Sequence, residues 1–147
     1  MLDGDKLRAG LCKDLGFSEE SRTENVRSAA EVARILSDAG QVVLVALIYP
    51  LRSDRALAQQ IIGSDFNEVF VDAALSVCEQ RDPKGLYAAA RAGKISGFTG
   101  IDAPYEAPES PALRLETADN GADAGVKKLT DFIKGNVALA ASARKTL

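Results

Sequence analysis

A long amphipathic helix followed at once by an apolar segment is the feature that most limits the folds open to this chain. Apolar side chains recur at three- and four-residue steps from Ser18 to Gly40, which predicts one helix. Ser18 or Ser21 can cap its N-terminus, and Ser21-x-x-Glu24 fits a capping box. The segment from Gln41 to Ile48 is rich in β-branched residues and predicts a strand buried on both faces.

The same alternation of helix and strand continues along the chain. The pattern predicts a helix over 52–62, a strand over 68–72, a helix over 74–80, an edge strand over 113–117 and a helix over 122–134. Such alternation favours an α/β fold with a parallel sheet. We expect one domain over 1–136, with a Gly- and Pro-rich lid at about 81–111, and an Ala-rich tail at 137–147 that forms a frayed helix.

Composition excludes several classes of function. With 18 Lys plus Arg against 21 Asp plus Glu, the chain lacks the basic excess of nucleic-acid binders. It contains no His, so proton transfer would fall to carboxylates, Lys, Tyr or Cys. Cys12 and Cys78 have no metal-binding or redox spacing and are expected to be reduced thiols of a cytoplasmic protein. No segment is expected to act as a signal peptide or to enter a membrane.

Four segments, in this order and at these spacings, resemble the adenylylsulfate kinase family. They are LDGDKLRAGL at 2–11, DLGFSEESRTENVR at 14–27, RDPKGLY at 81–87 and GFTGIDAPYEAPESP at 97–111. The resemblance implies a P-loop kinase-like three-layer sandwich with a parallel sheet. It also implies transfer of the terminal phosphoryl group of Mg²⁺-bound ATP to the 3′-hydroxyl of adenylyl sulfate, giving 3′-phosphoadenylyl sulfate for sulfate assimilation.

Two carboxylates at the start of the chain suit this chemistry. Phosphoryl transfer depends on positioning and charge neutralisation, so carboxylates are expected near the hydroxyl and the metal. Asp3 and Asp5 follow a short strand, Asp3 being assigned to the Mg²⁺ water shell or the 3′-hydroxyl and Asp5 to the substrate. Which of them accepts the proton stays open. The alternative is that Asp-Gly-Asp is only a turn and a helix cap.

The family resemblance also assigns residues to the nucleotide. Arg8, Arg22 and Asn25 match positions that hold the anionic groups and the ribose, and a guanidinium fork suits paired anionic oxygens. Phe17 and Phe98 match the two aromatic residues on either side of the adenine. Alternatively, Arg22 and Asn25 are solvated residues of the first helical turn, and Phe17 is a helix staple. Further substrate residues implied by the resemblance are Ile48, Lys84 and Leu86.

The resemblance assigns Arg81 and Arg91 of the lid to ATP, although charged lid residues are often simply solvated. Closing of the lid would exclude water and protect the phosphoryl donor.

The sequence also departs from the family pattern. It contains no G-x-x-x-x-G-K-[ST], so the Walker A loop and the first, central strand that leads into it are missing from these 147 residues. We expect neighbouring strands to have unpaired edges, apolar surface to be exposed, and this chain alone to be weak or inactive. Tyr49 replaces a small Ser, and we expect it to face the substrate pocket.

These features leave alternatives to the kinase. The main one is a non-catalytic module that still binds adenylyl sulfate. Another P-loop nucleotide kinase is disfavoured by the segment around Phe98 and by RDPKGLY. A homodimer or an association with a sulfurylase subunit is possible for the kinase.

Overall fold

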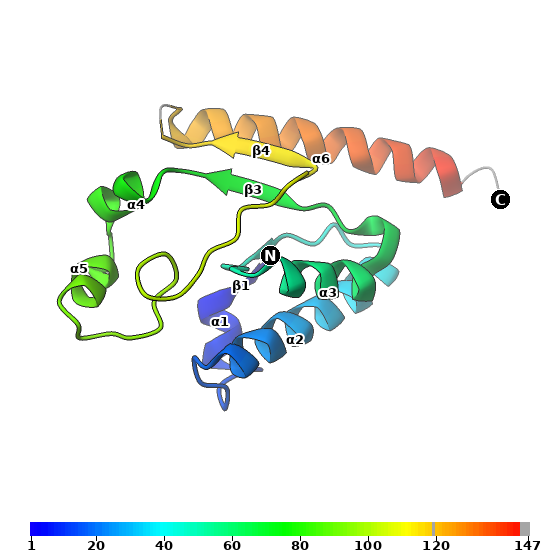
Figure 1. Ribbon diagram of the computed structural model, residues 1–147. Coiled ribbons are helices and arrows are strands. Elements are labelled where there is room, and N and C mark those ends of the chain that lie inside the picture. Colours follow the sequence, from blue (N-terminus) through cyan, green and yellow to red (C-terminus); the bar gives the residue numbers. More distant parts are fainter. Residues whose placement is uncertain (119, 145–147) are drawn as a thin grey trace. The chain divides into compact units, whose positions relative to one another are not determined.

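The computed structural model describes residues 1–118 and 120–144, with side chains as far as residue 136. These residues form helices and short parallel strands, which confirms the predicted α/β class (Figure 1). The chain divides into two compact units. The first contains Met1–Phe66 and Gly85–Pro108, and the second contains Asn67–Lys84 and Glu109–Leu147.

The first unit is built mainly from helices, together with one pair of short strands. Its elements are β1 (Leu2–Asp3), α1 (Gly4–Ala9), α2 (Glu19–Asp38), β2 (Val45–Ala46), α3 (Arg52–Ile62), the 3₁₀ turn η1 (Gly63–Asp65) and α5 (Leu86–Arg91). Strands β1 and β2 pair in parallel, with Leu2 opposite Val45 and Asp3 opposite Ala46. This pairing places the carboxyl end of β1, and therefore Asp3, beside the end of β2.

The ends of α2 follow the sequence signals closely. Ser18 is the N-cap, and its hydroxyl accepts a hydrogen bond from the Ser21 amide at 3.2 Å. The capping box predicted from Ser21 and Glu24 is wrong, because Ser18 takes the cap and the Glu24 carboxylate binds Arg27 instead. At the other end Gly40 has φ +82°, a conformation that glycine adopts without the steric cost of a side chain.

Helices α2 and α3 lie side by side and form the core of the first unit (Figure 1). Val26, Ala30 and Ala58 are the buried residues of this cluster, with Tyr49 and Phe66 among the side chains packed against it. Because two of the three central residues are alanines, the two helices can approach closely. Most of the stabilisation of α2 therefore comes from one narrow apolar face rather than from helix propensity.

The strand predicted over 41–48 is much shorter in the structure. Only Val45 and Ala46 are in strand conformation, and Val42 and Ile48 are 58% and 68% exposed. The prediction of burial on both faces is wrong here, because among the described residues β2 pairs with β1 alone. A strand with one partner keeps an open edge, and the expected exposure of apolar surface is found at these residues.

The second unit contains β3 (Val69–Asp72), α4 (Leu75–Arg81), β4 (Leu113–Glu116) and α6 (Ala122–Arg144). Strands β3 and β4 pair in parallel in the register Val69 to Leu113, and α6 packs against β4 (Figure 1). An ion pair between Asp72 and Arg114 joins the two strands at 2.5 Å. Helix α6 continues ten residues past the predicted end at Lys134 and takes in most of the predicted tail, while residues 145–147 lie outside the described residues.

Both cysteines are free thiols, as the sequence predicts, Cys12 being buried and Cys78 half-buried. In the described part of the chain, no helix combines the length and apolar character needed to cross a bilayer.

Candidate functional site

A pocket of about 250 Å³ in the first unit has three walls from distant parts of the sequence. One wall is the start of α2, the second is the chain entering α3, and the third is the loop 97–104. The lining residues are Phe17, Ser18, Glu19, Arg22, Pro50, Leu51, Gly97, Thr99, Ala103 and Pro104. The N-terminus of a 20-residue helix therefore opens into this pocket, a position that favours negative charge.

Two of the predicted substrate residues, Phe17 and Arg22, line this pocket, and Arg8 lies against Phe17. The Phe17 ring is 68% exposed, with the guanidinium carbon of Arg8 4.4 Å and that of Arg22 5.7 Å from its centroid. An exposed ring that contacts two cations is stabilised by cation–π attraction rather than by burial. Phe17 directly precedes the N-cap Ser18 and lies against Arg22 of the first helical turns, so the alternative of a helix staple stays open beside that of a ligand contact.

Both arginines direct their hydrogen bonds at backbone carbonyl oxygens. Arg8 donates to Leu15 at 3.2 Å and to Gly16 at 2.8 Å. Arg22 donates to Phe17 at 3.0 Å and to Gly97 at 2.8 Å. A carbonyl oxygen carries no net charge, so these contacts fix the two guanidinium groups without neutralising them. The positive charge stays available for an anionic ligand.

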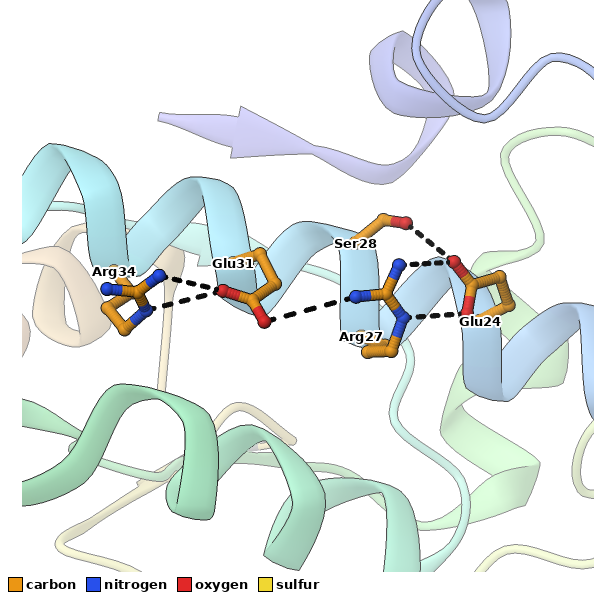
Figure 2. A network of polar contacts seen from close by, with 5 residues as sticks. All are labelled: Glu24, Arg27, Ser28, Glu31 and Arg34. Carbon is orange, nitrogen blue, oxygen red and sulfur yellow. Dashed lines mark hydrogen bonds and ion pairs between the residues drawn. The ribbon is translucent and has the colours of Figure 1, made fainter.

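Other arginines of α2 have a different environment (Figure 2). Arg27 binds the Glu24 carboxylate with two nitrogens at 2.7 and 2.8 Å, and Arg34 binds Glu31. The Glu24 carboxylate in turn raises the pKa of Arg27 further, and Arg27 lowers the pKa of Glu24. This ladder is exposed and internally neutralised, so Arg27 is a residue of the solvated helix face.

The loop that carries Phe98 is closed by one carboxylate. Asp102 accepts hydrogen bonds from the Gly97 amide at 2.8 Å and the Phe98 amide at 2.6 Å, which lower the pKa of Asp102. The Phe98 carbonyl oxygen accepts from the amides of residues 101, 102 and 103. Phe98 is half-buried, with the Tyr87 ring edge-on at 5.0 Å. The loop is thus a defined turn that holds Phe98 next to two pocket-lining residues, Gly97 and Thr99.

Asn25 lies one turn after Arg22 on α2 and carries an unsatisfied acceptor. It is 5% exposed, and its buried Oδ1 has no hydrogen-bond partner. Burial rules out the alternative of a solvated residue. A buried acceptor without a donor destabilises a fold, so such an atom is a candidate ligand contact.

Asp3 acts as a helix cap in the structure. Its Oδ1 accepts from the Asp5 amide at 3.1 Å and the Lys6 amide at 3.3 Å at the start of α1. Capping uses one carboxylate oxygen and fixes the side chain at the end of β1, so it is compatible with a second role for the other oxygen. Among the described residues no group of three acidic, Cys or His side chains is arranged to hold a metal ion.

The remaining predicted residues do not line the pocket. Ile48 is 68% exposed beside β2, while Leu86 and Arg91 begin and end α5. Arg81 and Lys84 belong to the second unit, where the Arg81 guanidinium donates to the carbonyl oxygen and the hydroxyl of Thr117.

Tyr49 does not face the pocket, so that prediction is wrong. Its ring packs against the α2–α3 core instead, and this burial, together with the charge of Asp54, raises the pKa of Tyr49 to about 12.

Sequence reasoning missed most of the pocket wall. Pro50, Leu51, Ala103 and Pro104 carry no side-chain chemistry, so they gave no functional signal. The sequence predicts a helix over 52–62 but does not single out Asp54 and Arg55, both of which are buried.

Comparison with known proteins identifies relatives over most of the chain. The family model described as Adenylylsulphate kinase matches residues 1–116. An adenylyl-sulfate kinase of Pseudomonas aeruginosa is 53% identical over 137 residues, which are 92% of this chain and 70% of that protein. The bifunctional enzyme NodQ of Rhizobium is 50% identical over 90% of this chain and 21% of its own length.

A solved structure shows the same fold. It is the APS kinase CysC of Mycobacterium tuberculosis in complex with AMPPNP and APS, which superposes with a TM-score of 0.86 at 51% identity. The match covers 90% of this chain and 78% of that one.

Proposed function

Because the chain belongs to the adenylylsulfate kinase family, a family of P-loop kinases, we propose that its reaction is phosphoryl transfer from ATP to the 3′-hydroxyl of adenylyl sulfate. The observation that carries this proposal is the pocket at the start of α2. There an aromatic ring, two guanidinium groups that no carboxylate of the described residues neutralises and a helix N-terminus come together. This combination suits a ligand with a planar base and a large negative charge.

The roles of the pocket residues follow from their chemistry. Phe17 offers an exposed ring for stacking on adenine, and Phe98 is held on the loop that forms the facing wall. Arg8 and Arg22 bind the phosphate and sulfate oxygens, exchanging carbonyl contacts for charged ones. The buried Oδ1 of Asn25 accepts a hydrogen bond from a ribose hydroxyl. Ile48, Lys84 and Leu86 stay predicted substrate contacts.

The carboxylates at the end of β1 fit a site for Mg²⁺ and ATP. Mg²⁺ usually keeps several waters and takes only one or two protein carboxylates with the substrate phosphates. The single carboxylate of Asp3 matches this demand, and Asp5, exposed in the first turn of α1, is a proposed substrate contact. Bound Mg²⁺ would neutralise charge on the transferring phosphoryl group. Arg81 and Arg91 are proposed contacts of ATP.

The comparisons give no support to the alternative of a non-catalytic binding module, since the relatives described above are named as enzymes. Cytoplasmic location, a homodimer and association with a sulfurylase subunit stay predictions.

Calorimetry with adenylyl sulfate tests the proposal on this chain. We expect micromolar binding by the unaltered protein, and about a tenfold or larger loss in Arg22→Ala, because a charge-assisted contact is removed. The matched control is Arg34→Ala, which removes an arginine of the same helix that is paired with carboxylates. Equal affinities of all three proteins would refute the site. Transfer of the γ-phosphoryl group to the 3′-hydroxyl is the direct assay of the reaction.

A further inference from the structure

The three walls of the pocket are joined in pairs by hydrogen bonds of charged side chains, most of which lie outside it. On the side between α2 and α3, the Thr23 hydroxyl donates to Oδ1 of Asp54 at 2.8 Å. Asp54 is only 3% exposed, although it is a carboxylate. A buried carboxylate is costly unless it is held by donors, so its position ties α3 to the first turns of α2.

The side between α3 and the loop is held by Arg55. This side chain is 7% exposed, and its guanidinium donates to the carbonyl oxygens of Tyr49 and Glu106, both at 2.6 Å. The two acceptors lie 57 positions apart in the sequence, one just before the Pro50–Leu51 wall and one just after Pro104. One buried cation therefore bridges the chain on both sides of the pocket.

Glu106 completes this contact from the loop side. Its amide donates to the Pro50 carbonyl oxygen at 2.8 Å, and its carboxylate accepts from the Arg52 amide at 2.7 Å. Leu51, the N-cap of α3, has no side chain that can cap the helix, so the carboxylate of a distant loop supplies the cap. Glu106 thus belongs to the start of α3 structurally, although it is far away in sequence.

The third side, between α2 and the loop, is closed by the hydrogen bond from Arg22 to the Gly97 carbonyl oxygen. The loop is consequently held at both ends, at Gly97 by α2 and at Glu106 by α3. Asp102 fixes its interior.

We propose that Asp54, Arg55 and Glu106 are positioning residues that hold the three pocket walls at the spacing required by the nucleotide. None of the three lines the pocket, so they act through Pro50, Leu51 and the loop 97–104. We call Asp54, Arg55 and Glu106 the polar frame. The identity of the ligand rests on the proposed function, whereas the role of the frame in fixing the loop does not.

The first arm of the test needs no ligand. Amide hydrogen exchange is compared by NMR in the unaltered chain, Glu106→Ala, Glu106→Gln, Arg55→Met and Arg34→Met. In Glu106→Ala and Arg55→Met we expect exchange at the Arg52 and Glu106 amides, and at the loop amides of Phe98 and Asp102, to become about tenfold faster. Glu106→Gln retains an acceptor for the Arg52 amide and should behave like the unaltered protein. Arg34→Met, which alters the exposed ladder, is the matched control for Arg55→Met.

The second arm measures binding of adenylyl sulfate by calorimetry. Because misplacing a pocket wall weakens contacts that the variant residue does not make, we expect about a tenfold rise in Kd for Glu106→Ala and Arg55→Met. Glu106→Gln should stay within about twofold of the unaltered chain.

The outcomes separate the two hypotheses. The proposed role of the polar frame is overturned if amide exchange of the loop is unchanged in Glu106→Ala. It is also overturned if that exchange is faster but the affinity for adenylyl sulfate is unchanged. Failure of Glu106→Gln to rescue overturns it as well. If the unaltered chain does not bind adenylyl sulfate, the proposed function fails, and faster loop exchange in the variants then still supports the frame. If Arg55→Met does not fold, the exposed Glu106 variants decide.

Discussion

Replacement of Asn25 by leucine should raise the stability of the free protein while it weakens ligand binding. Asn25 is buried on α2, and its Oδ1 has no donor. An unsatisfied buried acceptor costs about 1–3 kcal/mol. Leucine has a similar shape and no polar atom, so we expect the free energy of unfolding to rise by about 1 kcal/mol after some loss to imperfect packing. If a ribose hydroxyl donates to Oδ1, the affinity for adenylyl sulfate should fall about tenfold.

Urea unfolding followed by circular dichroism gives the stability, and calorimetry gives the affinity. Asn136→Leu is a matched control, because the Asn136 amide donates to the Phe132 carbonyl oxygen on α6 and so is satisfied. That variant should gain no stability and should bind the nucleotide normally. The reasoning is refuted if Asn25→Leu is destabilised with unchanged affinity, since the orphan acceptor would then be neither a cost to the fold nor a ligand contact.

Three further variants test the electrostatics of the first unit. Burial and the charge of Asp54 raise the pKa of Tyr49 from 10.0 to about 12, so the neutral phenol is favoured in the fold. The stability that this gives is present below pH 10 and is lost as the pH rises from about 10 to 12. The loss should be about 2–3 kcal/mol in urea unfolding, and Tyr49→Phe should not show it. Arg27→Ala should change the urea unfolding midpoint little, because its ion pairs are exposed, and calorimetry should find the affinity for adenylyl sulfate unchanged. The amides of Gly97 and Phe98 lower the pKa of Asp102 below its ordinary value of 3.8. The two hydrogen bonds that close the loop are therefore fully present above pH 3.8. They are lost only when the pH falls through the lower pKa that Asp102 has in the folded protein. NMR shifts of those two amides should report that midpoint, and Asp102→Ala should abolish the transition.

The sequence predicted those elements whose signals are local. Helix α2 is defined by its apolar periodicity, by Ser18 at one end and by Gly40 at the other, and the structure places all three as expected. The apolar segment from Val42 to Ile48 was a weaker basis for predicting a long buried strand. Apolar β-branched residues encode a preference for burial, but they do not encode the partner strand that provides it. Only the two residues that pair with β1 are in strand conformation.

The same distinction applies to the site. Phe17 and Arg22 were found from motifs, since their chemistry is visible in the residue type. Asp54 and Arg55 were not, because the helix 52–62 has polar residues at intervals typical of a solvated face. Their burial depends on contacts with Thr23 and with Glu106, which lies 51 residues after Arg55. Burial of this kind is a property of the tertiary structure, and no local pattern encodes it.

The kind of hydrogen-bond acceptor, more than the residue type, distinguishes Arg22, the proposed ligand contact on α2, from Arg27. Arg22 and Arg27 are five positions apart on one helix, and either would pass a sequence test for an anion-binding residue. Arg27 contacts carboxylates, so an incoming phosphate or sulfate would have to displace an existing anion. The Arg22 hydrogen bonds described above go to carbonyl oxygens, so an anion would meet a full positive charge while the guanidinium gives up weaker, neutral acceptors. Exchange of acceptors therefore favours ligand binding at Arg22 and opposes it at Arg27.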